Sequence, residues 1–235
     1  MTPRRTPLRS QTEQGLDMQQ GTNVVGTIYL TQRLLPLLEA GAPSRVVVLS
    51  SELANMSPPV PLDNIGGEKL GSSTVAEYGL SKLCDALYAV DFSRRYGSRG
   101  VLALSVHPGV VATELTDKAS AGCCWDAVMG CAMSMTACTP QVGAISTLYA
   151  ATVPGVKGAP QPGMSVCACA APAHLTPRRV AWAGATGGEG FGPNSMNRGF
   201  TNEWRPHHKQ FTPKVAEAML DAALVLIKAK GGKDV

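Results

Sequence analysis

RVVVLSS, residues 45–51, is the stretch that decides the fold, since it joins a short unbroken apolar run to two serines. Valines dominate the run, and no polar residue alternates with them. A strand that is apolar on both faces is typical of a parallel sheet covered by helices on both sides. We therefore expect residues 45–51 to form a buried parallel strand that ends at Ser50 and Ser51.

Helical and strand patterns alternate on either side of this segment. Apolar residues recur at helical spacing over residues 22–41, where Pro36 predicts a kink. A second helix is expected from residue 73 to a C-cap at Gly97, and residues 101–109 (VLALSVHPG) form a second buried strand. The order helix, strand, helix, strand predicts right-handed βαβ crossovers in a doubly wound parallel sheet.

The second half of the chain is less regular. Residues 118–153 are expected to be mostly helical, whereas Gly, Pro, Ala and Ser dominate residues 154–200 and predict a loop. Residues 179–185 (RVAWAGA) are the one strand candidate there. A closing helix is predicted over residues 212–232. Its signals are an N-cap residue, a proline at the first position and a stop glycine, namely Thr212, Pro213 and Gly231.

Composition excludes several classes of function. The net charge of +4 is small and dispersed, which argues against nucleic-acid binding. The sequence contains no run of eighteen apolar residues, so we predict no membrane span. The seven cysteines contain no CxxC pair, so we expect no metal site. Free thiols without a secretory signal favour the cytoplasm, while Arg4 and Arg5 in an acid-free start leave organelle import open.

Tyr78 and Lys82 stand four residues apart on the second predicted helix, so they share one face. The apolar stripe of that helix, Leu83, Leu87 and Val90, is centred well over 100° away around the helix axis. Three residues lie nearer to the pair and leave a small-residue surface where something could lie close: Asp85, Ala86 and Ala89. An ammonium near a phenol favours the phenolate, so this pair is a candidate acid/base couple.

Two strand ends are expected beside this pair. Ser50 and Ser51 follow the first strand, and HPGVVATEL (residues 107–115) follows the second. The carboxyl ends of parallel strands are where ligand sites of α/β proteins lie. The sequence therefore predicts one site at this edge of the sheet.

The ordered segments closely resemble the short-chain dehydrogenase/reductase family, and most of all its retinol-dehydrogenase-like branch. The segments are TNVVG (22–26), RVVVLSS (45–51), YGLSK (78–82) and HPGVVATEL (107–115), and the resemblance covers roughly residues 10–153. It implies a Rossmann-like doubly wound α/β domain. Residues 1–153 would be its catalytic half, and residues 154–235 its irregular Gly/Pro-rich segment and closing helix.

The resemblance also implies an NAD(P)-dependent oxidoreductase that interconverts a carbonyl and an alcohol on a small or lipophilic substrate. Tyr78 would be the general acid/base, and Lys82 would lower its pKa and bind the nicotinamide ribose. Ser51 would hold the substrate oxygen, and Asn23 would link Lys82 to solvent through water. Further residues would surround the nicotinamide: Pro108, Gly109, Val111 and Thr113.

Other features of the resemblance concern the cofactor, the partners and alternative roles. NADP is slightly favoured over NAD, and a homo-oligomer is compatible with a dimer surface partly on the Tyr78 helix. Ser50 is an alternative to Ser51 as the functional serine. For Asn23, the alternative to a catalytic role is that it simply starts a helix. His107 is expected to cap a strand end and Cys84 to lie in the core.

The glycine-rich turn that cradles the pyrophosphate in this family has no counterpart in the sequence. ATGGEGFG (residues 185–192) lies too far downstream to serve, and residues 163–177 match no expected element. We therefore expect an N-terminally truncated fold that lacks the first strands. A non-catalytic binding partner of a full-length relative is the alternative function.

Overall fold

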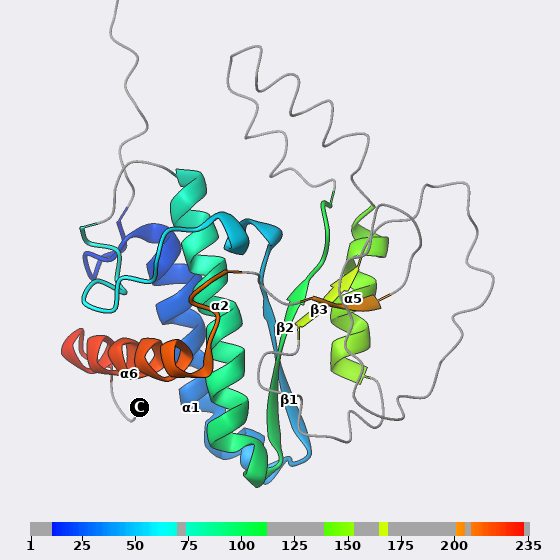
Figure 1. The fold of residues 1–235 in the computed structure, drawn as a ribbon. Helices are drawn as coiled ribbons and strands as arrows, with labels where there is room; N and C mark the ends of the chain where they lie inside the picture. The colour runs from blue at the N-terminus through cyan, green and yellow to red at the C-terminus, as the bar shows by residue number, and fades with distance from the viewer. Residues whose placement is uncertain are drawn as a thin grey trace, which may run out of the picture.

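The computed structural model describes the residues in the ranges 11–69, 74–111, 139–152, 165–168, 201–204 and 208–232. Four strands form one sheet in the order β1–β2–β3–β4 (Figure 1). They are β1 (Ser44–Leu49), β2 (Val101–His107), β3 (Ser165–Ala168) and β4 (Thr201–Trp204). The first three strands are parallel, and β4 pairs antiparallel to β3.

The two strands expected from the sequence pair with each other in register from Ser44↔Val101 to Leu49↔Val106. Their carboxyl ends therefore meet at one edge of the sheet. The first strand stops at Leu49, two residues earlier than expected, because the chain turns into the short helix η2 (Glu52–Met56) after Ser51. The second stops at His107, directly before Pro108, which has no N–H to donate to a ladder.

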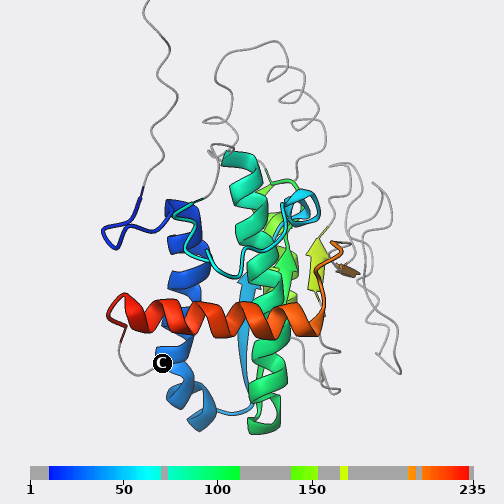
Figure 2. The ribbon, with the colours of Figure 1, turned by 60° about the vertical axis from the view of Figure 1, so that its left-hand side comes forward.

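Helices cover both faces of the sheet, which is a Rossmann-like α/β arrangement. The helices are η1 (Gln20–Gly26), α1 (Thr27–Ala40), α2 (Thr74–Tyr96), η3 (Gly97–Arg99), α5 (Pro140–Thr152) and α6 (Pro213–Ala229). α1 and α2 lie on one face and α5 on the other (Figure 1), while α6 crosses the outer side of α1 and α2 (Figure 2). None of the helices in the described ranges is long and apolar enough to cross a membrane.

Helix α2 is buried on all sides in its middle part. Leu83, Leu87 and Val90 enter the core as expected, but Asp85, Ala86 and Ala89 are buried too. The small-residue surface expected at these three residues is therefore covered by the protein itself, because η2, the sheet and α6 all pack against α2.

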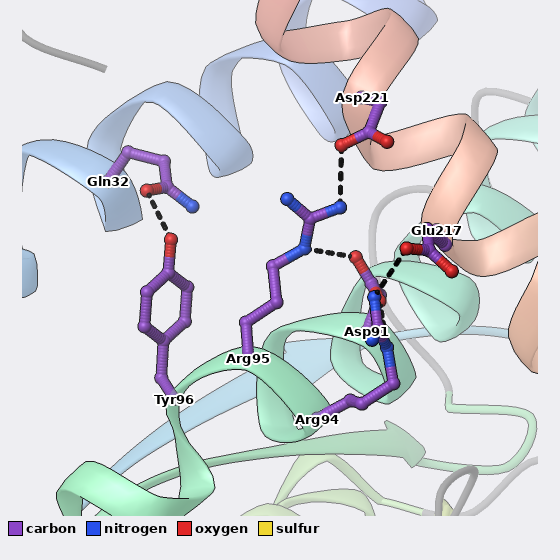
Figure 3. Close-up of polar contacts among 7 residues, drawn as sticks. All are labelled: Gln32, Asp91, Arg94, Arg95, Tyr96, Glu217 and Asp221. Atoms are coloured by element: carbon purple, nitrogen blue, oxygen red, sulfur yellow. Dashed lines mark hydrogen bonds and ion pairs between the residues drawn. The ribbon is translucent and has the colours of Figure 1, made fainter.

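A network of ion pairs holds α6 on α2 (Figure 3). The buried Asp91 accepts hydrogen bonds from the side chains of Arg94 and Arg95, at 2.7 and 2.5 Å. Each arginine also reaches across to α6: Arg94 pairs with Glu217 at 3.0 Å and Arg95 with Asp221 at 2.6 Å. The closing helix is thus part of the folded unit that contains α2.

Several predictions about element ends can be compared with the structure. The closing helix is confirmed: the Thr212 hydroxyl accepts from the Val215 N–H at 3.3 Å, and Pro213 is the first helical residue. Helix α2 ends at Tyr96, directly before the expected C-cap Gly97, while the left-handed conformation falls on Gly100, with φ +79°, after η3.

Two strands were not foreseen. β3 lies within residues 163–177, where no element was expected, and β4 follows the segment predicted as a loop. Four-residue strands offer too few positions for a period-two pattern to stand out. The strand candidate at 179–185 and most of the helical prediction over 118–153 lie outside the described residues, and the remainder of the latter forms α5.

Candidate active site

The predicted site residues gather where β1 and β2 end and the N-terminal half of α2 passes. Lys82 marks this junction, because its Nζ donates 2.9 Å to the carbonyl oxygen of Leu49, the last residue of β1. The same Nζ lies 5.8 Å from the ring centroid of Tyr78, one helical turn away. Tyr78 is half-buried and Lys82 keeps 13% of its side chain exposed, so ligands can approach both.

The two serines after β1 do different things. Ser50 is buried and its hydroxyl donates 2.7 Å to the Lys82 carbonyl oxygen, which fastens the strand end to α2. Ser51 is half-buried and begins η2, where its Oγ accepts from the Leu53 N–H at 3.3 Å. Accepting a bond leaves the Ser51 O–H proton available to donate, and no acceptor for it is found among the described residues.

A glycine next to the tyrosine brings these elements together. A Cβ atom at Gly79 would lie 2.5 Å from the Leu53 carbonyl oxygen of η2. Real Cβ atoms do not approach so closely, so only glycine allows η2 to rest directly on α2. The short helix that begins at Ser51 is thereby held beside Tyr78. The sequence analysis did not single out Gly79.

Asn23 reaches α2 from a different element. It lies inside η1, a π-helical turn, and is therefore not a helix-start residue. Its Nδ2 donates 3.0 Å to the Ser81 hydroxyl, which in turn donates 2.8 Å to the Tyr78 carbonyl oxygen. π-Helical turns are uncommon and concentrate at functional sites. Asn23 is thus joined to the helix backbone at Tyr78 through Ser81.

The segment after β2 completes the edge. Gly109 has φ +81°, a left-handed conformation that suits glycine after Pro108. The Val111 side chain packs against α5, where its Cγ2 lies 2.5 Å from the position of a Cβ at Gly143. Pro108, Gly109 and Val111 therefore line the end of β2, and Thr113 lies outside the described residues.

Three buried titratable groups lie close to the site. Burial raises the pKa of Asp85 to about 7, and its pairing with Lys82 at 2.8 Å opposes that rise. Burial also strongly raises the pKa of Cys84, and the nearby Asp85 charge adds to it. His107, the last residue of β2, has its pKa lowered by burial. Cys84 is in the core, as expected.

The Asp85–Lys82 ion pair was missed by the sequence analysis, which treated Asp85 as part of a small-residue surface. The signal was present, since a lysine and an aspartate three apart on a helix are neighbours. Among the described residues, no group of three or more His, Cys, Asp or Glu side chains is placed to hold a metal ion. Cys124, Cys131 and Cys138 lie outside those residues.

Comparison with known proteins finds relatives of one family over part of their length. No family model matches the chain. Human retinol dehydrogenase 13 is 41% identical over 104 residues, which is 44% of this chain and 31% of that protein. Human retinol dehydrogenase 11 is 37% identical over 148 residues, which is 63% of this chain and 45% of that protein. A short-chain dehydrogenase/reductase of Armillaria gallica is 38% identical over 117 residues, 46% of this chain and 37% of that protein.

The chain is similar to members of the short-chain dehydrogenase/reductase family. Retinol dehydrogenases are among these relatives, in agreement with the resemblance that the sequence motifs carry. The chain spans less than half of the length of these curated relatives, between 31% and 45%.

A solved structure supports the fold. An uncharacterized protein from Mycobacterium paratuberculosis matches with a TM-score of 0.60 at 22% sequence identity, over 94% of this chain and 62% of that one. At this identity the likeness concerns the α/β fold alone.

Proposed function

We propose that the edge formed by β1, β2 and α2 is the catalytic site of an NAD(P)-dependent oxidoreductase that interconverts a carbonyl and an alcohol. The observation that carries this proposal is the anchoring of Lys82 at the end of β1, one turn from Tyr78 and beside Ser51. The dehydrogenases among the relatives support the reaction class. Their names also suggest a small or lipophilic alcohol as the substrate class.

The residues at this edge fit the nicotinamide end of a dinucleotide. Lys82 has three N–H donors, two of which go to Leu49 and Asp85, so one remains for a ribose hydroxyl. The turn at Pro108 and Gly109, followed by Val111, offers a wall for the nicotinamide. Thr113 belongs to the same proposed wall by family resemblance. NADP is the first candidate dinucleotide and NAD the second, again by resemblance alone.

The proposed chemistry divides among four side chains. The bound dinucleotide supplies or accepts the hydride. In carbonyl reduction, Tyr78 donates its phenol proton to the substrate oxygen, so that the tyrosine O–H bond breaks as the alcohol O–H bond forms. The Lys82 ammonium stabilises the phenolate that this leaves. In alcohol oxidation Tyr78 takes the same proton back.

Ser51 and Asn23 have supporting roles in this proposal. The free O–H of Ser51 would donate to the substrate oxygen and polarise it, a task that Ser50 cannot share because its proton goes to the Lys82 carbonyl. Asn23 would link Lys82 to solvent through water from its place beside Ser81. This arrangement supports Ser51 over Ser50 as the functional serine.

Tyr78→Phe tests the proposed function directly. Rates of NADPH and NADH oxidation are measured with a panel of lipophilic aldehydes and ketones, for the unaltered protein, for Tyr78→Phe and for the matched control Tyr29→Phe on the exposed side of α1. Loss of the proton donor is expected to lower kcat/KM by about 10²- to 10⁴-fold. Equal rates for Tyr78→Phe and the unaltered protein would overturn the proposal.

A second candidate is a non-catalytic partner of a longer relative. In the described residues β1 is the outermost strand, and the outer edge of such a strand can pair with another chain. A stable one-to-one complex with a purified retinol dehydrogenase, together with undetectable dinucleotide binding by calorimetry, would favour this candidate.

A further inference from the structure

Asp85 is a buried carboxyl beside the proposed acid/base pair, with an exposed fraction of only 2%. Its Oδ2 lies 2.8 Å from Lys82 Nζ, and this ammonium also donates to the Leu49 carbonyl oxygen. The lysine is therefore held at two points, one on its own helix and one at the end of β1. Such a tether fixes where the positive charge lies relative to Tyr78.

Burying a carboxyl with a single ionic partner is costly, because desolvation offsets much of the gain from the ion pair. Asp91 on the same helix shows the alternative, since two arginines share its carboxylate and both continue to α6. Asp85 has no such second cation among the described residues. Its position is better explained by its effect on Lys82 than by a contribution to stability.

We propose that Asp85 is a positioning residue for the oxidoreduction at this site. Its carboxylate holds the Lys82 ammonium at the end of β1 and offsets part of the positive charge that Lys82 presents to Tyr78. The inference rests on the proposed function, in which Tyr78 exchanges the proton. It adds a fifth residue to the four side chains of the proposed chemistry, one that acts only through Lys82.

The offset depends on the protonation state of Asp85. When its carboxyl is ionised, the pair with Lys82 is nearly neutral and the phenolate of Tyr78 gains little from it. When the carboxyl is protonated, the full charge of Lys82 acts on the phenol. Because burial raises the pKa of Asp85 to about 7, both states are populated near neutral pH.

Other charged groups around α2 do not perform this task. Cys84 stays a thiol because burial raises its pKa, and burial keeps His107 neutral by lowering its pKa. Glu52 of η2 acts electrostatically on His107. Glu77, near the start of α2, is buried as well. Other charged groups on and against the helix belong to the network near its C-terminal end: Asp91, Arg94, Arg95, Glu217 and Asp221. Within the described residues, Lys82 is the charged side chain that acts on Asp85.

The first test measures acetylation of Lys82 by acetic anhydride against pH, quantified on the Lys82 peptide by mass spectrometry. Removing the carboxylate in Asp85→Asn is expected to lower the pH of half-maximal labelling by about one unit, the effect of one lost neighbouring charge. The matched control Asp221→Asn, which removes an exposed carboxylate on α6, should label like the unaltered protein. Unchanged labelling in Asp85→Asn, or an equal change in both variants, would overturn the inference.

The second test needs only the unaltered fold, should Asp85→Asn not fold. The ring carbon signal of Tyr78 in protein labelled with ¹³C-tyrosine, assigned with Tyr78→Phe, is followed by NMR against pH. An inflection near pH 7 is expected when the Asp85 carboxyl ionises, and its absence would contradict the inference.

Neither test requires turnover, so the inference about Asp85 can fail or succeed independently of the proposed function. If turnover is found, alcohol oxidation provides a third readout. The acid limb of its pH–rate profile should move down by about one unit in Asp85→Asn, because the uncompensated ammonium favours the phenolate. If the acid limb stays at the same pH in Asp85→Asn and only the overall rate falls, Asp85 has a merely structural role.

Discussion

Helix α2 buries two aspartates in two different ways. Asp91, near the C-terminal end, is fully buried and lies between Arg94 and Arg95 (Figure 3). Asp85, in the middle of the helix, is almost as buried but pairs only with Lys82. The first carboxylate belongs to a network that fastens one helix to another. The second faces the junction where two strands end and a ligand can approach.

This difference teaches how one helix can serve both stability and chemistry. A carboxylate with two guanidinium partners is well compensated for its burial, and its network holds α6 in place. A carboxylate with one ammonium partner is poorly compensated, so its protonation can change near neutral pH. We infer that Asp91 has a structural role and that Asp85 serves the chemistry of the proposed site, and three predictions examine that division.

The largest expected effect is on stability when Asp91 is changed. Asp91→Asn leaves one amide oxygen where two arginines each need an acceptor, and we expect a loss of about 3 kcal/mol in the free energy of unfolding. Asp85→Asn should not lower it, because the amide relieves the cost of burying a charge. Urea unfolding monitored by circular dichroism measures both variants. Equal losses in the two variants would remove the distinction between the two aspartates.

A smaller effect is expected at the contact between α2 and η2. Gly79→Ala places a methyl group against the Leu53 carbonyl and should cost about 1–3 kcal/mol through overpacking. It should also move Ser51 away from Tyr78. Gly97→Ala is the control, since its Cβ would meet only the Leu102 side chain at 3.5 Å. Thermal unfolding of both variants compares them, and equal midpoints would show that η2 does not rest on Gly79.

The third effect is a dependence of stability on pH. Because burial raises the pKa of Asp85 from 3.8 to about 7, the folded state holds this proton more tightly than the unfolded state does. The contribution of Asp85 to stability is therefore complete below about pH 4 and is lost as the pH rises towards 7. Asp85→Asn removes this contribution.

The pH effect is measured as a difference between two proteins. The stability of Asp85→Asn minus that of the unaltered protein should increase from pH 4 to pH 7, since other carboxyls contribute equally to both. Urea midpoints at half-unit pH intervals give this difference. A difference that is constant across the range would mean that the Asp85 pKa is not raised by folding.

The sequence predicted the part of the fold that has a strong periodic pattern. β1, β2, α2 and α6 lie where apolar runs and capping residues placed them, because burial and end signals are local in the sequence. β3 and β4 were missed because four residues carry little pattern. Their pairing to β2 and to each other comes from tertiary contacts that no local signal records.

The site was predictable in its residue types but not in its contacts. The order of the motifs predicted that Ser51, Tyr78 and Lys82 lie close together, and in the structure they lie at the same edge of the sheet. Two contacts could not be predicted: the hydrogen bond of the Ser50 hydroxyl to the Lys82 carbonyl oxygen, and the ion pair of Asp85 with Lys82. Both depend on the side-chain directions that result when other elements pack around α2. When a helix is covered on all sides, each of its polar groups needs a partner inside the protein. The helical spacing of apolar residues does not show which partner that is.

The most direct test of the central claim follows the hydride itself. Each protein is incubated with NADPH carrying deuterium at the transferable position of nicotinamide C4 and a lipophilic aldehyde, and the alcohol is analysed by mass spectrometry. The account predicts deuterium on the carbinol carbon with the unaltered protein and with Tyr29→Phe, and none above background with Tyr78→Phe. Equal incorporation by Tyr78→Phe and the unaltered protein, or none by any of them, would contradict it.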